Sequence, residues 1–358
     1  MTATTFYRWV ERRVRRSLLS PLLRPLTDTV ARSHRGLGTI LMYHRISAPG
    51  DEGTDWGNRS LAVDESAFES QVEYLSKHFR CMSLPECVRL LASSKLPERV
   101  VVLTFDDGYR DNLERAVPVL EKYDVPATVY VATGLVEGSA SLWWCELEDA
   151  LNRLEKLEIV LDTGTRRWPL ATTRHRRQAF REIGEWGKSR DPEVFGALMQ
   201  QLRQAVSSAG SALQRSSQNV PEPSGLMLSW DELDKLAAHP LVTIGAHTVT
   251  HPPLARLSAA EAERELRGSK QALEERLGQN VDHFAYPYGG SEHVGRRELE
   301  LAASVGFKSA VTTTESHLSA DHGRELHALP RLMVQYGDSL RDLEWRLSGL
   351  HVALRLRK

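Results

Sequence analysis

The nine residues VVLTFDDGY, 101–109, join an apolar run to two adjacent acids and a glycine. A short β-branched run that ends in polar residues predicts a buried strand that stops at the surface. Because side chains alternate along a strand, Asp106 and Asp107 point in different directions and can serve two different roles. Gly108 then permits a turn that a residue with a Cβ would resist. The alternative is that one aspartate caps a helix starting near Asp111 and the other is solvated.

A second apolar run ends in two histidines. Residues 242–251 read VTIGAHTVTH, so His247 and His251 are four residues apart, and a helical turn or compact loop would bring both imidazoles to one side. A carboxylate with two histidines, and other positions left to water, suits a divalent metal in a catalytic site. Two unrelated surface histidines would give the same sequence pattern. Together with an aspartate pair at another strand end, however, the histidines predict a metal site.

The composition describes a large globular protein. The chain has 358 residues, 26% of them charged, and a formal net charge of −1, which gives no indication of a nucleic-acid partner. Three cysteines form no even disulfide framework, so we expect a reducing, cytoplasmic compartment. No stretch approaches the roughly 20 apolar residues of a membrane span. Nothing in the sequence indicates an oligomeric state.

Apolar strand patterns alternate with helical ones along most of the chain. The clearest helix is predicted from Ser258 to Leu277, with a capping box of Ser258 and Glu261 and a stop at Gly278. Another is predicted over residues 67–80. Strands alternating with helices imply a parallel sheet, and seven strands indicate a closed or nearly closed barrel. The predicted strands are residues 39–43, 100–105, 127–132, 242–246, 282–286, 308–312 and 331–334.

The motif TFDDGY at residues 104–109, followed by HTVTH at 247–251, resembles the polysaccharide deacetylases of the NodB-homology type, carbohydrate esterase family 4. The resemblance covers about residues 38–335, interrupted by a long insertion. It implies a distorted (β/α)7 barrel. It also implies a hydrolase that removes N-acetyl or related acyl groups from an amino sugar in a polysaccharide or a lipid-linked glycan intermediate.

The resemblance also implies roles for the motif residues. Asp107, His247 and His251 would hold a divalent metal that activates water, and Asp106 would be the general base. The backbone N–H of Tyr109 would help to hold the oxyanion. We expect Zn²⁺, although two histidines and an aspartate also accept Co²⁺, Ni²⁺ or Mn²⁺.

The general acid departs from the usual family pattern. The late motif that normally supplies a histidine reads LPRLMV at residues 329–334 and has none. Residues 42–44, MYH, instead look like the early Tyr-His of the circularly permuted poly-N-acetylglucosamine deacetylases. The first and last strands of a barrel are neighbours, so His44 is predicted as the acid. The alternatives are that His44 only fixes a barrel end, or that His317 or His327 is the acid.

The third motif also departs from the family. Residues 284–290 read FAYPYGG, without the arginine that usually orients the base, and resemble a Tyr-Pro-Tyr-Gly variant of the permuted group. We expect Tyr286, Pro287 and Tyr288 to contact substrate. Arg331, at a later strand end, could pair with Asp106 instead.

Between residues 134 and 225 the alternation of strands and helices breaks. We interpret this arginine-rich segment as a helical insertion after the third strand, with a Ser/Gln/Pro-rich linker at its end. Loops that follow barrel strands lie on the catalytic face, so the insertion could cover the site. Trp143 and Trp144 begin it, and their rings could stack on a sugar or anchor the insertion to the core.

The two ends of the chain are basic. Residues 1–36 hold eight arginines against Glu11 and Asp28, and apolar residues recur at four-residue steps from position 6 to 18. This pattern fits an amphipathic helix on the inner face of an anionic membrane, and equally a helix packed on the barrel or a frayed terminus. The expected organisation is therefore this segment, a deacetylase barrel over 37–348, and a basic tail over 349–358.

Two other functions remain open at this stage. A glycan-binding pseudoenzyme could retain the fold, although it would have no need of Asp106, Asp107, His247 and His251 together. A barrel glycosidase needs two acids about 5–10 Å apart across a sugar, and adjacent aspartates are poorly suited to that.

Overall fold

The computed structural model describes residues 36–48, 56–209 and 225–351. Their main sheet is parallel and has the strand order β11-β10-β9-β6-β5-β1-β12, with β4 beside β5. All seven predicted strands are present, and β4, only two residues long, is an addition. The strands are β1 (Gly38–Tyr43), β4 (Arg80–Cys81), β5 (Val100–Phe105), β6 (Ala127–Val131), β9 (Val242–Ala246), β10 (His283–Ala285), β11 (Ser309–Val311) and β12 (Leu332–Met333).

The sheet curls until its two edges nearly meet. The segment that leads into β12 pairs with β11: the N–H of Thr312 donates to Leu329 O at 2.8 Å, and the N–H of Leu329 donates to Ala310 O at 3.0 Å. A parallel sheet that curls in this way is a distorted barrel, which confirms the predicted fold class. The polar residues that follow β1, β5, β9 and β10 therefore share one rim.

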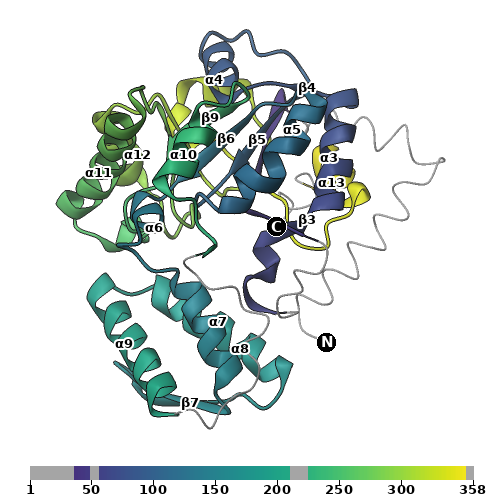
Figure 1. The fold of residues 1–358 in the computed structure, drawn as a ribbon. Helices are drawn as coiled ribbons and strands as arrows, with labels where there is room; N and C mark the ends of the chain where they lie inside the picture. Colours follow the sequence, from purple (N-terminus) through teal and green to yellow (C-terminus); the bar gives the residue numbers. More distant parts are fainter. Residues whose placement is uncertain (1–35, 49–55, 210–224, 352–358) are drawn as a thin grey trace.

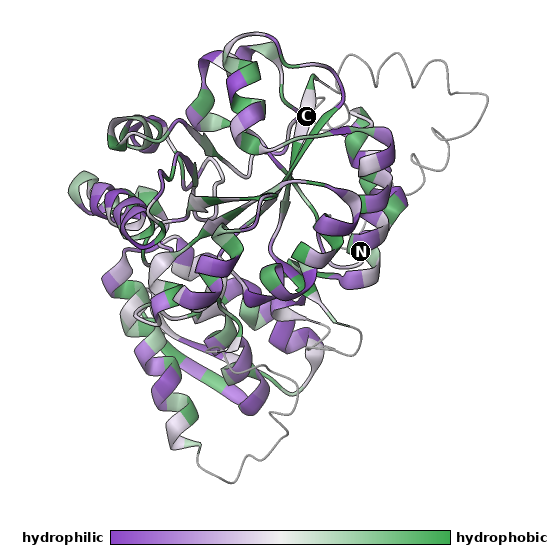
Figure 2. Ribbon diagram, turned by 45° about the horizontal axis from the view of Figure 1, so that its top comes forward, coloured by the Kyte–Doolittle hydropathy of each residue, from purple (hydrophilic) through white to green (hydrophobic). Residues whose placement is uncertain are grey.

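Helices cover the outside of the sheet (Figure 1). Alternating strand residues such as Leu41, Val101 and Leu103 face these helices, whereas Ile40 and Val102 face the opposite way. Figure 2 shows the strands as mainly apolar and the outer helix faces as polar. The covering helices are α3 (Glu65–His78), α4 (Leu84–Ala92), α5 (Val117–Tyr123), α10 (Trp230–Ala237), α11 (Ala259–Leu277), α12 (Arg296–Val305) and α13 (Leu340–Leu347).

The clearest predicted helix is confirmed as α11. Ser258 Oγ accepts from the N–H of Glu261, whose carboxylate accepts from the N–H of Ser258. Gly278 ends the helix in the left-handed region, with φ of 63°. The helix predicted over 67–80 is confirmed as α3, two residues earlier at each end.

The segment after β6 forms a separate lobe with its own apolar core (Figure 1). It is not purely helical as we predicted, because residues 156–169 form an antiparallel hairpin. Lys156 to Leu161 alternate between exposed and buried positions, which is the two-residue period of a strand. Its elements are α7 (Trp143–Arg153), β7 (Lys156–Leu161), β8 (Gly164–Pro169), α8 (Thr173–Lys188) and α9 (Pro192–Ser208), whereas the short α6 (Thr133–Glu137) stays beside the barrel helices.

Several sequence-based expectations fall outside this description. Apart from Gly36, the basic N-terminal segment lies outside the described residues, as do 352–358 of the predicted tail and 210–224 of the predicted linker. Among the helices that the structure does describe, none has the length and apolar content needed to span a bilayer. Cys81, Cys87 and Cys145 are unpaired.

Candidate active site

Both aspartates of the first motif are buried at the carboxyl end of β5. Asp106 is 2% exposed and Asp107 3%. Asp107 has φ of 78° and Gly108 has φ of 86°, so the chain turns sharply as it leaves the strand. A left-handed aspartate is uncommon, and the turn points its carboxylate across the rim. Neither carboxylate is a solvated surface group, so that alternative is wrong.

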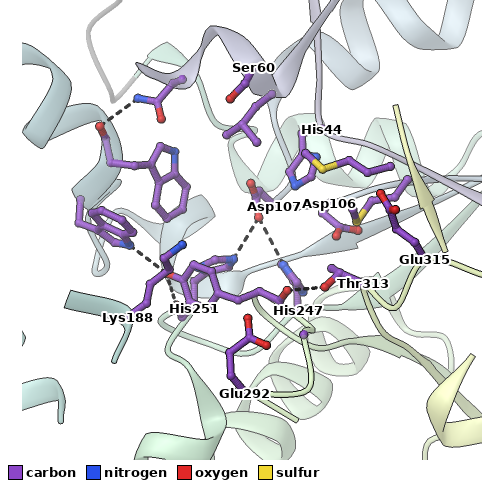
Figure 3. A pocket seen from close by; sticks show the side chains of 18 of the residues that line it. His44, Ser60, Asp106, Asp107, Lys188, His247, His251, Glu292, Thr313 and Glu315 are labelled. Atoms are coloured by element: carbon purple, nitrogen blue, oxygen red, sulfur yellow. Dashed lines mark hydrogen bonds and ion pairs between the residues drawn. The ribbon is translucent and has the colours of Figure 1, made fainter. Parts of the chain in front are cut away.

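Asp107 faces the two histidines (Figure 3). Its Oδ1 lies 3.3 Å from Nε2 of His247 and 3.3 Å from Nε2 of His251. One ligand atom from each of the three residues lies within 4.8 Å of the others. Around a tetrahedral ion with bonds of about 2.0–2.1 Å, neighbouring ligand atoms are about 3.3 Å apart. The three atoms therefore have the spacing of a metal site.

The hydrogen bonds around these atoms also fit a cation. His247 Nδ1 lies 2.7 Å from Ala285 O. Because a carbonyl oxygen can only accept a hydrogen bond, Nδ1 carries a proton. In the neutral ring, Nε2 therefore presents a lone pair to Asp107. Within the described residues, the buried Asp107 Oδ1 and His251 Nδ1 have no hydrogen-bond partner. A lone pair facing a buried carboxylate oxygen is unfavourable unless a cation lies between them.

The pKa values of the three groups reflect the same crowding. Burial tends to raise the pKa of Asp107, but the facing imidazoles of His247 and His251 outweigh it and hold this pKa well below its usual value. Burial also lowers the pKa of His251, whereas for His247 the nearby aspartates outweigh burial and raise the pKa. The aspartate is therefore ionised and ready to bind a cation.

The loop that carries the histidines is strained and clamped. Thr248 and His251 have φ of 68° and 59°, a region that L-residues rarely adopt. Glu265 on α11 accepts from the N–H groups of Val249 and Thr250 at 2.8 and 2.9 Å, and Thr248 Oγ1 accepts from the N–H of His251 at 3.0 Å. Strain that is held by specific contacts is common where side chains must converge on a functional site.

Asp106 forms a bidentate ion pair with Arg331. The two oxygens lie 2.6 and 2.7 Å from Nη1 and Nη2 of Arg331, which is fully buried. Arg331 also donates to Thr312 O and to Thr104 Oγ1, so its position is fixed. Burial tends to raise the pKa of Asp106, but the Arg331 charge and hydrogen bonds outweigh it and lower this pKa. The predicted contact between Arg331 and Asp106, in place of the arginine missing from the third motif, is confirmed.

His44 lies beside the aspartates, in the break between β1 and β2 (Arg45–Ser47) (Figure 3). Its carbonyl accepts from Nδ2 of Asn112 at 2.8 Å. Asp111 binds the next two residues, accepting from Arg45 Nε at 3.0 Å and from the N–H of Ile46 at 3.1 Å. Within the described chain His44 Nδ1 is buried without a partner. Asp111 and Asn112 thus hold the His44 segment, a function that no motif indicated.

Asp107, His247 and His251 line a pocket of about 730 Å³. The insertion supplies part of its wall, including Trp143, Trp144 and Lys188. Trp143 Nε1 donates to Tyr288 Oη at 2.9 Å, and Trp144 Nε1 donates to Tyr109 Oη at 3.1 Å. The two tryptophans therefore anchor the insertion to the barrel and line the pocket as well.

Other predicted contact residues lie behind the pocket wall. Tyr286 and Pro287, which we expected to contact substrate, are buried and do not line it; Tyr286 Oη donates to His327 O at 3.0 Å. The side chain of Tyr109 is also buried, but its backbone N–H makes no hydrogen bond within the described residues. His317 is buried against Thr39 Oγ1, away from the aspartates.

Pocket residues that the motifs did not indicate come from loops far apart in the sequence. They include Ser60, Glu292, Thr313 and Glu315, all visible around the aspartates in Figure 3. A pocket of this kind, with ionisable groups converging on one rim and aromatic walls, is the arrangement of a small-molecule or glycan site.

Comparison with known proteins identifies the family. The chain belongs to the polysaccharide deacetylase family, whose model matches residues 93–189 and 193–310, more than half of the chain. It is a carbohydrate deacetylase, a hydrolase of the type that the first motifs resemble.

Individual relatives agree with this assignment. A Bacillus subtilis (strain 168) protein, YxkH, assigned to the polysaccharide deacetylases, is 24% identical over 84% of this chain and 72% of its own. The poly-β-1,6-N-acetyl-D-glucosamine N-deacetylase of Staphylococcus aureus (strain N315) is 37% identical, but over only 22% of this chain and 27% of its own.

Two solved structures share the fold. The Streptococcus pyogenes deacetylase PplD, in complex with acetate, has a TM-score of 0.56 and 25% identity, over 86% of this chain and 97% of that one. IcaB from Ammonifex degensii has a TM-score of 0.54 and 19% identity, over 87% of this chain and 97% of that one. The glycosidase interpretation finds no support in these relatives.

Proposed function

We propose that this deacetylase removes N-acetyl or related acyl groups from an amino sugar with the help of a divalent ion. The proposed ligands of this ion are Asp107, His247 and His251, and the expected ion is Zn²⁺. The observation that carries the proposal is the 3.3 Å spacing of Asp107 Oδ1 from both imidazole nitrogens, beside an aspartate bound to Arg331. When bound, such an ion lowers the pKa of water towards about 7 and polarises the acyl oxygen.

Asp106 is the proposed general base. Arg331 occupies both of its oxygens, yet each carboxylate oxygen has two lone pairs, so one remains free to accept a proton from the attacking water. The low pKa keeps the carboxylate ionised, and the buried ion pair fixes its direction. Asp106 lines the same pocket as Asp107, which supports a role for both acids beside the substrate.

His44 is the proposed general acid, and Tyr109 a proposed oxyanion donor. An amide nitrogen must gain a proton before it leaves, and His44 lines the pocket on a clamped backbone. The N–H of Tyr109, unpaired within the described chain, is available to a developing negative oxygen.

The substrate is proposed to be an N-acetylated glycan or a lipid-linked sugar. One relative is named for deacetylating poly-β-1,6-N-acetyl-D-glucosamine, and the similar PplD structure contains acetate, the product of such a reaction. We also propose a cytoplasmic location at the inner face of the membrane, from the unpaired cysteines and the basic N-terminal segment. A binding protein without activity would gain nothing from a strained loop that directs two imidazoles at one carboxylate.

Metal analysis of paired variants tests the proposal. Asp107→Ala and His247→Ala should lose the bound ion and acetate release together, whereas the neighbouring Asp106→Asn should keep the ion and lose about 10²–10⁴-fold in turnover. Elemental analysis and acetate release from a panel of N-acetylated glycans measure the two effects. A full metal content in Asp107→Ala protein would show that the ligand assignment is wrong.

A further inference from the structure

A second cleft adjoins the active-site pocket on the side of the insertion. It has a volume of about 290 Å³ and lies between the α8–α9 turn and the loop that carries His251. The cleft and the active-site pocket share part of their lining, namely Trp143, Lys188, His251 and Tyr288. A group in the second cleft can therefore belong to the same substrate molecule as the acyl group.

The cleft is lined by cations and, among the described residues, by no carboxylate. Lys188, Arg190 and Arg203 all contribute to its lining. Each has an acidic partner outside the cleft: Glu185 at 2.6 Å from Lys188, Asp162 at 3.4 Å from Arg190, and Glu146 at 2.9 Å from Arg203. The acids reduce the net charge and hold the cations in place, but none lines the cleft itself.

The arginines keep donors that these ion pairs do not use. A guanidinium has five N–H groups, and Nη2 of Arg190 lies 3.4 Å from Asp162 Oδ2. Its Nε is buried and has no partner within the described chain. The Arg190 guanidinium also lies over the Trp186 ring, 5.1 Å from its centre, which limits its rotation. The Arg190 side chain is 34% exposed, so the accessible part of its guanidinium, and not the buried Nε, can bind an anion in the cleft.

From these contacts we propose that the cleft binds a phosphate group carried by the substrate. The inference rests on the proposed deacetylation and specifies its substrate class: an N-acetylated amino sugar that bears a phosphate. One arginine can bind two phosphate oxygens through parallel hydrogen bonds, and lysine binds phosphate as a point charge. Lys188 lies where the two hollows meet, with its Nζ 5.6 Å from the centre of the Tyr288 ring. The hydroxyl groups of a neutral sugar can accept from these donors, but they carry no negative charge to balance the three cations.

The test compares neutral and phosphorylated substrates on the metal-loaded, full-length enzyme. The probes are a β-1,6-linked N-acetylglucosamine trisaccharide, the same trisaccharide with a phosphomonoester, and N-acetylglucosamine linked through a diphosphate to a short isoprenyl chain. We expect kcat/KM to be at least about tenfold higher for one phosphorylated probe. The probe that gains most identifies the source of the phosphate.

Arginine variants assign the preference to the cleft. Arg190→Gln and Arg203→Gln should each reduce the ratio of kcat/KM for phosphorylated over neutral probe by about tenfold. Arg166→Gln is the matched control, because Arg166 is also an insertion arginine in an ion pair but lies outside the cleft. Its ratio should change by less than about twofold. Using two variants guards against one that fails to fold, which a thermal melt reports.

The possible failures are distinguishable. If the wild type releases acetate equally from neutral and phosphorylated probes, and both cleft variants keep that ratio, the phosphate subsite is refuted while the deacetylase proposal stands. If the wild type releases acetate from no probe, both proposals fail for these sugars. A preference that Arg166→Gln reduces as much as Arg190→Gln would reflect general charge and would also refute the subsite.

Discussion

Arg331 determines how Asp106 can act, because a buried carboxylate needs a fixed counter-charge. The two hydrogen bonds of 2.6 and 2.7 Å favour the ionised form over the protonated one. Because the pKa of Asp106 is lowered from the ordinary 3.8, its carboxylate stays ionised at pH values where an ordinary aspartate is partly protonated. In the proposed mechanism the base is therefore active across the neutral and mildly acidic range.

Replacing the bidentate contact should move the acidic limb of the activity profile. Arg331→Lys keeps one charge but loses the paired hydrogen bonds, so the pKa of Asp106 rises and kcat/KM falls at a higher pH than in the wild type. Profiles of kcat/KM from pH 4 to 8 measure the shift. Arg297→Lys is the control, since Arg297 pairs with the buried Glu298 elsewhere. An unmoved acidic limb would mean that Asp106 is not the titrating base.

The same contact predicts a pH-dependent stability difference. Because the folded-state pKa of Asp106 is lowered, the pair stabilises the fold above the unfolded-state pKa and loses this effect as pH falls through the folded-state value. The gap in unfolding free energy between wild type and Arg331→Lys should thus be larger at pH 7 than at pH 3. Urea unfolding at the two pH values measures it, and an equal gap would contradict the assigned direction.

His44 can be tested through the leaving group. His44→Ala should keep its metal and lose about 10²–10⁴-fold in turnover on an N-acetyl sugar, whose amine needs a proton to leave. On 4-nitrophenyl acetate, whose leaving group needs no proton, the loss should be far smaller. Comparing both rates in wild type and variant separates an acid from a structural histidine. Equal losses on both substrates would assign His44 to structure alone.

The residues of the proposed metal and catalytic site were largely visible in the sequence, whereas those that hold them in place were not. Asp107, His247 and His251 stand in short motifs at strand ends, so their convergence could be predicted. Asp111 and Glu265 act on backbone groups 65 and 15–16 residues away. No local pattern marks such contacts, because the partner is set by the tertiary fold.

At the scale of elements, strands that are buried on both faces were the easiest to predict. Their short apolar runs are mostly buried, and all seven appear in the sheet. The β7–β8 hairpin was missed because only one of its faces is buried and its other face carries charged residues such as Glu158 and Arg167, which lie opposite each other. Arginine favours helices by propensity, but the alternation of Leu157, Ile159 and Leu161 decides the structure.

The cap of α11 gives a measurable prediction at this scale. Ser258→Ala removes the oxygen that accepts from the N–H of Glu261, and should lower the unfolding free energy by about 0.5–2 kcal/mol. Ser76→Ala is the control, because Ser76 Oγ donates only to Glu73 O within its own helix. Urea unfolding compares both with the wild type. Equal stability of Ser258→Ala and wild type would show that the capping box contributes little.

At the scale of the whole molecule, two bodies meet over one site. The barrel supplies the acids and histidines, and the insertion lobe supplies Trp143, Trp144 and Lys188 to the pocket wall. The Trp143–Tyr288 and Trp144–Tyr109 hydrogen bonds join the lobe to the loops that follow β10 and β5. In the proposed mechanism, substrate choice can therefore change through the lobe while the catalytic groups stay fixed on the barrel rim.

The basic N-terminal segment adds a prediction about where the molecule acts. Its eight arginines against two acids should attract anionic lipid, with each basic side chain near the surface contributing about 1 kcal/mol. Full-length protein should float with vesicles that contain anionic phosphatidylserine, and floatation should fall as salt rises, since screening weakens surface attraction. A chain without residues 1–36 should stay at the bottom of the gradient, while vesicles of neutral phosphatidylcholine serve as the control. If the shortened chain floats as well as the full one, the membrane contact lies elsewhere on the protein.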